Sequence, residues 1–333
     1  MSCNLAIAGV TGAVGQEFLR ILKERNFPFD SLKMLASSRS AGKKIPFKGK
    51  EYTVEELTQD SFAGIDIALF SAGGSRSKEF TAAAVEAGAV VVDNSSAFRM
   101  DPEVPLVVPE VNADAISTHK GIIANPNCST IIANVPVWPL HKANPVKRMI
   151  VSTYQAASGA GMAAMLELEQ QAREVLDGKP VTCEALAYQL AFNCFCHNSP
   201  TGPNGYNEEE IKMVKETHKI FSCPEMAITC TCIRVGVLRA HCESINLEFA
   251  DPITPDEVRD LLRTAPGVDV IDDPVANRHP MPIDASGKDD IYVGHIRQDE
   301  SIPDNRGINL WIAGDQIRKG AALNAVQIAE KLV

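Results

Sequence analysis

The sequence lacks long apolar runs and lacks an excess of basic residues. No run reaches the ~20 apolar residues that a membrane-spanning helix needs, so we expect no membrane partner. The 32 Lys and Arg residues are outnumbered by 42 Asp and Glu residues, and the formal net charge is −10. Such a charge disfavours binding to nucleic-acid phosphates and to anionic membranes. We therefore expect no nucleic-acid partner, although a local basic pocket for a small anion is compatible with this charge.

The nine cysteines also lack the regular spacing of a disulfide framework. Their number is odd, and they are scattered through core-like segments. Reduced thiols in a cytosol-like compartment are the better interpretation. The N-terminal MSCNLAIAGVTG shows neither a signal-peptide nor a transit-peptide pattern, so we expect a cytoplasmic protein. A plastid location would require that a transit peptide had been removed.

Two different patterns divide the chain. The length of 333 residues allows about two domains, and 45% hydrophobic residues suffice for a core. In the first part, short apolar strand patterns alternate with helix patterns, which predicts parallel βαβ units with helices on both faces of a sheet. The expected strands cover 4–10, 32–37, 66–73, 89–96, 105–111 and 121–126, and the expected helices cover 13–25 and 77–88.

The second part is typical of an α+β region with mostly antiparallel strands. Two long strand patterns lie within 227–250, and Thr254 with Glu257 forms a capping box that predicts a helix start. Further helix patterns cover 162–176, 208–221 and 324–333. We expect a nucleotide-binding domain of residues 1–128 with the C-terminal helix 315–333, and a second domain of residues 129–314.

A glycine-rich turn follows the first expected strand. It reads GVTGAVG, so the glycines are spaced G-x-x-G-x-x-G instead of G-x-G-x-x-G. Glycines let the backbone turn tightly and approach a pyrophosphate at a helix N-terminus. An ordinary β–α turn is the alternative, but the strand before and the helix after favour a dinucleotide cofactor. We expect it to contact Gly9, Thr11, Gly12, Ala13 and Val14.

The end of the second expected strand lacks the acidic residue that NAD sites usually place there for the ribose hydroxyls. The sequence ASSRSAGKK instead offers Ser37, Arg39 and Ser40. Hydroxyls and a guanidinium suit a 2′-phosphate, so we predict NADP as the cofactor instead of NAD. Composition alone leaves a solvated basic loop as the alternative.

Cys128 stands at the break between two apolar runs, in IIANPNCSTIIANV. A thiol at a helix N-terminus gains from the helix dipole and from unpaired N–H groups, which favour the nucleophilic thiolate. Most lone cysteines are simply small buried side chains. The later segment IRVGVLRAH adds Arg234 and His241, the cation and the acid/base group that thiol-dependent acyl transfer needs. In an isolated strand, these two would more often be a surface arginine and a core histidine.

The segment Cys194-Phe195-Cys196-His197 could contribute to a zinc site, which needs about four ligands. No matching second pair lies near it in the sequence. We therefore expect core thiols and a loop histidine, and no metal.

Six motifs occur in order along the chain: GVTGAVGQEFL, NPNCST, STYQAASGAG, EEIKMVKET, RVGVLRAHCES and KGAALNAVQIAE. From residue 4 to residue 333 this set closely resembles the aspartate-β-semialdehyde dehydrogenase family. The resemblance implies a Rossmann domain, a second domain for catalysis and dimerisation, and NADPH-dependent reduction of L-aspartyl-4-phosphate to L-aspartate-4-semialdehyde with release of phosphate. That reaction belongs to the aspartate pathway to lysine, threonine, methionine and isoleucine. A homodimer is implied, and a tetramer is left open.

The resemblance also implies residue roles. Cys128 is expected to form the acyl thioester, Gln155 to orient the bound intermediate, and His241 to act as acid/base. Arg234 is expected to hold the substrate α-carboxylate and Glu209 its amino group.

Glu208 and Glu210 are the alternatives to Glu209, which we choose because it precedes Lys212 by three residues, as in the family pattern. The expected phosphate site consists of Arg99, Asn127 and Lys212, and the residues expected near the nicotinamide are Ser158, Gly159 and Gln316.

Three alternatives remain. N-acetyl-γ-glutamyl-phosphate reductase shares the fold and the chemistry, and glyceraldehyde-3-phosphate dehydrogenase also pairs a cysteine with a histidine. The segments RVGVLRAHCES and EEIKMVKE fit neither as well. A non-catalytic NADP-binding or structural relative should have lost the nucleophile or the acid/base group, but both Cys128 and His241 are present.

Overall fold

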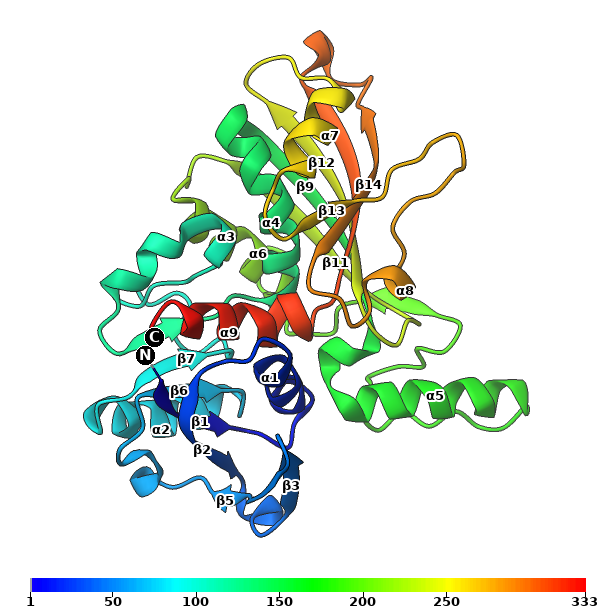
Figure 1. Ribbon diagram of the computed structural model, residues 1–333. Helices are drawn as coiled ribbons and strands as arrows, with labels where there is room; N and C mark the ends of the chain where they lie inside the picture. Colours follow the sequence, from blue (N-terminus) through cyan, green and yellow to red (C-terminus); the bar gives the residue numbers. More distant parts are fainter. Residues whose placement is uncertain (1) are drawn as a thin grey trace. The chain divides into compact units, whose positions relative to one another are not determined.

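The computed structural model describes residues 2–333, and its contacts divide the chain into two compact units (Figure 1). Unit 1 contains the residues up to Asn127 together with Ala321–Val333, and unit 2 contains Cys128–Gly320. The expected boundaries placed Cys128 in the first domain and began the C-terminal return at residue 315. In the structure, Asp315 is bonded to Arg239 of unit 2, and Gly320 N–H donates to the Asp315 carbonyl. These bonds keep residues 315–320 with unit 2.

Unit 1 is built on a six-stranded, fully parallel sheet with the strand order β5-β2-β1-β6-β7-β8. A small antiparallel hairpin accompanies it, formed by β3 (Lys44–Phe47) and β4 (Lys50–Thr53). The sheet strands are β1 (Cys3–Ala8), β2 (Phe29–Ala36), β5 (Glu55–Glu56), β6 (Ile67–Phe70), β7 (Val90–Asp93) and β8 (Ile122–Ala124). The helices are α1 (Ala13–Glu24), α2 (Gly74–Glu86), α3 (Pro109–Asn112) and α9 (Leu323–Glu330). This arrangement confirms the predicted Rossmann-type domain.

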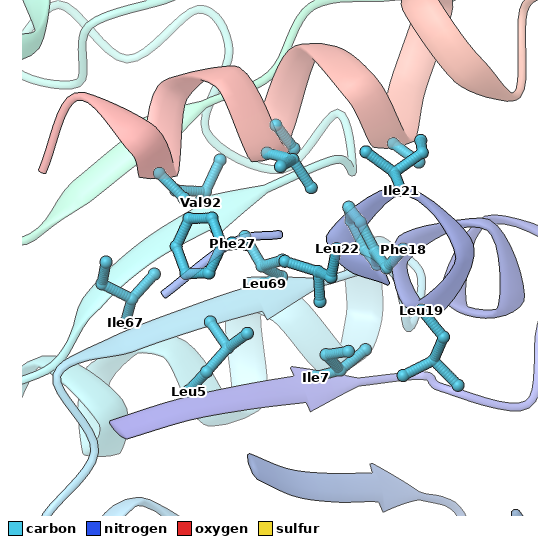
Figure 2. Packing of buried hydrophobic residues seen from close by; sticks show 14 of the residues in the cluster. Leu5, Ile7, Phe18, Leu19, Ile21, Leu22, Phe27, Ile67, Leu69 and Val92 are labelled. Carbon is cyan, nitrogen blue, oxygen red and sulfur yellow. The ribbon is translucent and has the colours of Figure 1, made fainter. Parts of the chain in front are cut away.

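Helices cover both faces of the unit 1 sheet, because its strands alternate between two apolar clusters. Leu5 and Ile7 of β1 pack with Phe18 of α1 in one cluster, which also contains residues of α9 (Figure 2). Ala6 and Ala8, which point the other way, belong to a second cluster with residues of α2. A parallel sheet buried on both faces explains why its strands are continuously apolar in the sequence.

One expected strand of unit 1 is wrong. Residues 105–111 were expected to be extended, but only Leu106 makes an isolated parallel bridge, to Ala124, and α3 begins at Pro109. Proline has no N–H for a ladder bond and is favoured at the first position of a helix. Two prolines within these residues therefore shorten the strand and begin a helical turn.

Unit 2 is built on a seven-stranded mixed sheet with the order β10-β11-β9-β12-β15-β14-β13. Two of its pairings, β11–β9 and β13–β14, are parallel and the other four are antiparallel, which confirms the α+β prediction. The strands are β9 (Val146–Gln155), β10 (Cys194–Cys196), β11 (Ala227–Val235), β12 (His241–Phe249), β13 (Val268–Val270), β14 (Ile291–Gln298) and β15 (Gly307–Gly314). The helices are α4 (Cys128–Ala143), α5 (Met162–Leu176), α6 (Glu208–Phe221), α7 (Pro255–Arg263) and α8 (Pro282–Ala285).

Short helical turns complete both units. The 3₁₀ turns are Ser38–Ser40, Gln59–Phe62, Ala113–Thr118, Ala157–Ala160 and Pro303–Asn305, and a π-helical turn covers Arg318–Ala322. The predicted capping box of Thr254 and Glu257 is present at the start of α7. Within residues 2–333, no helix combines the length and the apolar character needed to cross a membrane.

The strand register of unit 2 places three of the predicted site residues side by side. Arg234 on β11 pairs with Gln155 on β9, the strand between β11 and β12. On the other side of β9, Cys242 pairs with Tyr154, so His241 lies next to Gln155. All three side chains are buried. Adjacent strands thus present a cation, an amide and an imidazole in one row.

Replacing Phe18, which is fully buried between the sheet and α9, should destabilise unit 1. We expect Phe18→Ala to lower the free energy of unfolding by about 3–5 kcal/mol, because a large cavity remains. Phe18→Leu should cost less. Val275→Ala, at a side chain that is 98% exposed, is the control. Urea unfolding measures all three, and equal midpoints for Phe18→Ala and Val275→Ala would contradict the packing.

Candidate active site

The glycine loop of unit 1 is tight for a physical reason. Gly9, which directly follows β1, has a φ of +90°, and a Cβ there would overlap the carbonyl of Ser71. A Cβ on Gly15 would overlap the backbone of Gly9 and Val10. The loop between β1 and α1 can therefore close only with glycine at these two positions.

A pocket of about 440 Å³ opens beside this loop. Six predicted cofactor residues line it together: Gly9, Thr11, Gly12, Ser37, Arg39 and Ser40. Predicted contacts Ala13 and Val14 are the first residues of α1 and are not among the lining residues. Lys43 and Arg76 also line the pocket, and the sequence analysis did not identify them. Lys43 follows Arg39 within the same basic loop, whereas Arg76 comes from α2, a separate βα unit that no local motif connects to the loop.

The pocket has the charge that a phosphate requires. Arg39, Lys43 and Arg76 line it, and its lining, as far as residues 2–333 define it, contains no carboxylate. The first turn of α1 carries no acidic residue either. These residues fit a cofactor with a pyrophosphate and an additional phosphate on the adenosine ribose.

Arg99 lies in unit 1 and is buried with its guanidinium anchored to the backbone. Its Nε donates to the Asn125 carbonyl at 2.9 Å and its Nη2 to the Asn94 carbonyl at 2.8 Å. Asn127 is buried at the end of the same unit, whereas Lys212 belongs to unit 2. The phosphate site expected from these three residues remains a prediction.

Cys128 is the first residue of α4 in unit 2 and is partly exposed. No acidic residue lies in the first turn of α4, so the helix N-terminus keeps its positive potential at the thiol. A Cβ on Gly320 would lie 2.9 Å from the Cys128 Cβ. Gly320 therefore lets the backbone pass directly against the Cys128 side chain.

The amide of Gln155 links the start of α4 to the start of α6. Its Nε2 donates to Ser129 Oγ at 2.7 Å and to Glu209 Oε1 at 3.1 Å. The other oxygen of Glu209 accepts from Lys212 Nζ at 3.2 Å. Because a carboxylate only accepts, these bonds fix the orientation of the Gln155 amide.

Geometry supports the choice of Glu209 over its neighbours. Glu208 is exposed, and Glu210 closes the capping box with Asn207 and accepts from the Cys232 N–H. Within residues 2–333, Glu209 is the only one of the three that contacts another predicted site residue. Its role toward the substrate remains a prediction.

Ala156 connects Arg234 and His241 through its backbone. Its N–H donates to His241 Nδ1 at 3.0 Å, and its carbonyl accepts from Arg234 Nη1 at 2.7 Å. A Cβ on Gly159 would lie 3.0 Å from both Arg234 Nη1 and His241 Nε2. Glycine at this position leaves the space in front of the two side chains open.

The environment holds His241 neutral. Burial lowers the pKa of His241 to about 3, and the positive charge of Arg234 adds to this effect. Since Nδ1 accepts from a backbone N–H, the proton of the neutral ring is on Nε2. Nε2 is buried and has no hydrogen-bond partner among the described residues. The ring therefore presents an unused N–H donor.

The pKa of Arg234 is subject to opposing influences. Burial lowers the pKa of the guanidinium, while the negative charges of Cys128 and Glu209 raise it. Arginine stays ionised under such conditions. A buried cation thus lies within electrostatic range of both the thiol and the carboxylate.

The residues expected near the nicotinamide also lie together. Gln316 Nε2 donates to Ser158 Oγ, and its Oε1 accepts from the Ala240 N–H at 3.0 Å. Ala240 directly precedes His241 in the chain. Gln316 thus connects Ser158 to the residue before His241, and Gly159 lies against the His241 ring. Contact of these three residues with a cofactor remains a prediction.

In unit 2, sequence reasoning did not identify Ser129, Gly320 and His197, which lie next to predicted site residues. Ser129 stands beside Cys128 within NPNCST, whereas nothing local marks Gly320. His197 lies in a loop, as expected, and within electrostatic range of Glu209, Arg234 and Lys212. The neighbouring thiols of Cys194 and Cys196, which were expected in the core, are exposed. Within residues 2–333, no three His, Cys, Asp or Glu side chains are grouped to hold a metal ion.

Two family models match the chain. Residues 4–119 match "Semialdehyde dehydrogenase, NAD binding domain", and residues 137–319 match "Semialdehyde dehydrogenase, dimerisation domain". The aspartate-semialdehyde dehydrogenase of Synechocystis sp. is 56% identical over 330 residues, which cover 99% of this chain and 97% of that protein.

Solved structures agree with these matches. Aspartate-semialdehyde dehydrogenase II of Vibrio cholerae, solved in complex with ASA, aligns with a TM-score of 0.96 at 45% identity and covers 100% of this chain and 98% of its own. The Candida albicans enzyme, solved with NADP, aligns with a TM-score of 0.78 at 25% identity, with coverage of 100% and 98%. The chain therefore belongs to the aspartate-semialdehyde dehydrogenase family.

Proposed function

We propose that this protein reduces L-aspartyl-4-phosphate to L-aspartate-4-semialdehyde, with NADPH as hydride donor and a thioester on Cys128 as intermediate. The observation that carries the mechanism is the bonded set in unit 2. There the row of Arg234, Gln155 and His241 meets the start of α4, which bears Cys128, and Glu209 of α6. A thiol, a buried cation, a carboxylate and an N–H donor are the groups that the reaction needs.

The substrate is a small amino acid with two charged groups at one end. Arg234, with Nη1 on the Ala156 carbonyl, keeps further N–H donors for the α-carboxylate. Glu209 offers its carboxylate to the α-ammonium group, next to Lys212. Arg99, Asn127 and Lys212 are the residues we assign to the phosphate.

The cofactor assignment rests on the pocket of unit 1. Arg39, Lys43 and Arg76 provide positive charge for a 2′-phosphate, with Ser37 and Ser40 as hydroxyl donors. The Candida albicans relative was solved with NADP. When bound, the reduced nicotinamide supplies a hydride to the carbonyl carbon of the thioester. Ser158, Gly159 and Gln316 are the residues we assign to the nicotinamide end.

The first chemical step forms the thioester. The Cys128 thiolate attacks the acyl carbon, the C–O bond to phosphate breaks, and phosphate leaves with its electron pair. The helix N-terminus at Cys128 and the Arg234 cation both favour the thiolate. Backbone N–H groups at the start of α4 are placed to stabilise the oxyanion that forms at the same carbon.

The second step returns the thiolate. After the carbonyl carbon has accepted hydride, the C–S bond breaks, the aldehyde forms and the electron pair returns to sulfur. His241 holds its proton at Nε2 and can donate a hydrogen bond to the developing negative charge. Because Nδ1 already accepts from the Ala156 N–H, the ring faces the substrate with its Nε2 proton. This geometry supports a role for His241 as an acid, which is one of the two functions in the predicted acid/base role.

The assembly and location follow from the same assignments. The match to a dimerisation domain supports a homodimer, and a pair of dimers forming a tetramer is a further hypothesis. The nine cysteines are thiols, three of them exposed. Exposed thiols suit a reducing compartment, so we assign the protein to the cytoplasm.

The test measures the proposed reaction in reverse, at alkaline pH, where this direction is convenient to follow. NADP is reduced by L-aspartate-4-semialdehyde in a phosphate-dependent reaction. We expect turnover that requires phosphate and that is absent with N-acetylglutamate semialdehyde. Cys128→Ala should lower turnover by about 10⁴-fold or more, because no thioester can form. Cys183→Ala, at an exposed thiol, should match the parent. A folded Cys128→Ala variant with most of its activity would rule out the thioester.

The basic residues of the pocket should decide between NADP and NAD. We expect Arg39→Ala to raise the KM for NADP at least about tenfold, because charged hydrogen bonds contribute ~1.5–3 kcal/mol and about 1.4 kcal/mol is a factor of ten. The KM for NAD should stay the same. Arg76→Ala should act in the same direction, and Lys50→Ala on β4 is the control. Equal effects on the two cofactors would show that Arg39 does not contact a 2′-phosphate.

Burial of His241 should make the folded protein sensitive to acid. Its pKa of about 3 is below the ~6.5 of an unfolded chain, so between these values only the unfolded state binds the proton. The neutral, buried imidazole therefore does not lower the free energy of unfolding above pH ~6.5. Below that pH, the free energy of unfolding falls by up to about 1.4 kcal/mol per pH unit, because only the unfolded state gains the proton.

Urea unfolding at pH 7 and pH 5 measures this dependence. We expect a smaller loss of stability on acidification in His241→Asn than in the parent, with His119→Asn as control. An unchanged pH dependence in His241→Asn would argue against a neutral buried imidazole.

A further inference from the structure

His197 lies beside the row of Arg234, Gln155 and His241, at the point where β10 ends. In the β10–β11 pairing, Phe195 lies opposite Arg234, and two residues later His197 N–H donates to the Cys232 carbonyl at 2.8 Å. Alternation puts the His197 side chain on the same sheet face as Arg234. It is therefore a diagonal neighbour of Arg234, within reach of a long side chain.

One edge of the His197 ring is anchored locally. Nδ1 accepts from the Ser199 N–H at 3.2 Å and lies 3.1 Å from Ser199 Oγ. Nδ1 can accept from this N–H only while the ring is neutral and carries its proton on Nε2. The anchor therefore requires the unprotonated form of Nδ1.

Ser199 carries this anchor onward to Glu209. Its Oγ accepts from the Glu209 N–H at 3.2 Å and donates to Asn207 Oδ1 at 3.4 Å. Asn207, the N-cap of α6, also donates through Nδ2 to the His197 carbonyl at 3.3 Å. His197 and Ser199 thus form a strap across the first turn of α6, where Glu209 is the second residue.

Charged groups face His197 from two elements packed against it, with a titratable histidine on a third. Glu209, Glu210 and Lys212 belong to α6, Arg234 belongs to β11, and His241 belongs to β12. Burial is the largest influence and lowers the pKa of His197, and Arg234 and Lys212 act in the same direction against the two glutamates. The ring is consequently neutral near pH 7, as the strap requires.

We propose that His197 is a positioning residue for substrate recognition: through Ser199 it holds the backbone of Glu209 so that this carboxylate meets the substrate α-ammonium group. The inference rests on the proposed function, because it assumes that Glu209 binds that group. Protonation at Nδ1 would place two N–H groups against each other and release the strap. Substrate affinity should then fall in acid through His197, independently of the chemistry at Cys128.

Two substitutions separate the anchor from the bulk of the ring. In His197→Asn, the side-chain oxygen can still accept from the N–H two residues on, as in an Asx-turn. In His197→Leu, no acceptor remains. Ser199→Ala removes the next link and leaves the ring in place. His119→Leu is the matched control, because Gly121 N–H donates to His119 Nδ1 in the same local bond at 3.0 Å, in unit 1.

The measurement is steady-state kinetics of the oxidative direction with two aldehydes, L-aspartate semialdehyde and succinate semialdehyde, which lacks the amino group. For His197→Leu and Ser199→Ala we expect the KM for aspartate semialdehyde to rise about tenfold, the scale of one lost charged hydrogen bond. The preference for aspartate over succinate semialdehyde should fall by a similar factor. The KM for NADP should not change, and His197→Asn should stay within about threefold of the parent.

The pH profile gives an independent readout. The KM of the parent for aspartate semialdehyde should rise on acidification, at a pH lower than an ordinary histidine would give, because burial lowers the pKa of His197. The KM of His197→Asn should not follow this rise. If His197→Leu does not fold, the pH profile of His197→Asn and the KM of Ser199→Ala still test the proposal.

Unchanged KM and unchanged preference in folded His197→Leu would overturn the inference. So would a His197→Asn variant as impaired as His197→Leu, because the ring itself would then matter and not its acceptor. Absence of turnover in the parent protein would instead reject the proposed function, so the two failures are distinguishable.

Discussion

The peptide groups of Ala156 organise the catalytic half of this protein. Its N–H fixes the tautomer of His241 and its carbonyl fixes the guanidinium of Arg234. These bonds exist because β9 is the central partner of both β11 and β12, which bring the two side chains to its end from opposite sides. A cation and an imidazole are thereby held close together in a buried site without a direct bond between them.

Burial of the polar side chains in the row of Arg234, Gln155 and His241 is costly. Hydrogen bonds compensate most of that cost. Gln155 bonds to Ser129 and Glu209, and Glu209 bonds to Lys212. Two buried atoms of the row, His241 Nε2 and Gln155 Oε1, have no hydrogen-bond partner within residues 2–333. Buried polar atoms normally have partners, so one unused donor and one unused acceptor within a bonded row indicate where a ligand completes the site.

Glycine has two separate functions in this molecule. At Gly9 and Gly15 it lets the backbone of unit 1 fold closely on itself, so that a helix N-terminus can face a phosphate. At Gly159 and Gly320 it keeps space free against Arg234, His241 and Cys128. A side chain at the first pair would break the turn, whereas a side chain at the second pair would crowd Arg234, His241 and Cys128.

Local sequence by itself determined the βαβ pattern, the glycine turn, the basic loop at Arg39 and the capping box of α7, because each depends on neighbours a few residues apart. Ordered motifs predicted Cys128, Gln155, Arg234 and His241 as site residues. Tertiary structure alone decided which groups meet: Arg76 reaches the pocket from another βα unit, and Glu209 is distinguished from Glu208 and Glu210 by its bonds. His197 joins the site because β10 pairs with β11, although the two strands are about thirty residues apart in the chain. Strand register sets such contacts, and the sequence pattern of either strand does not specify its partner.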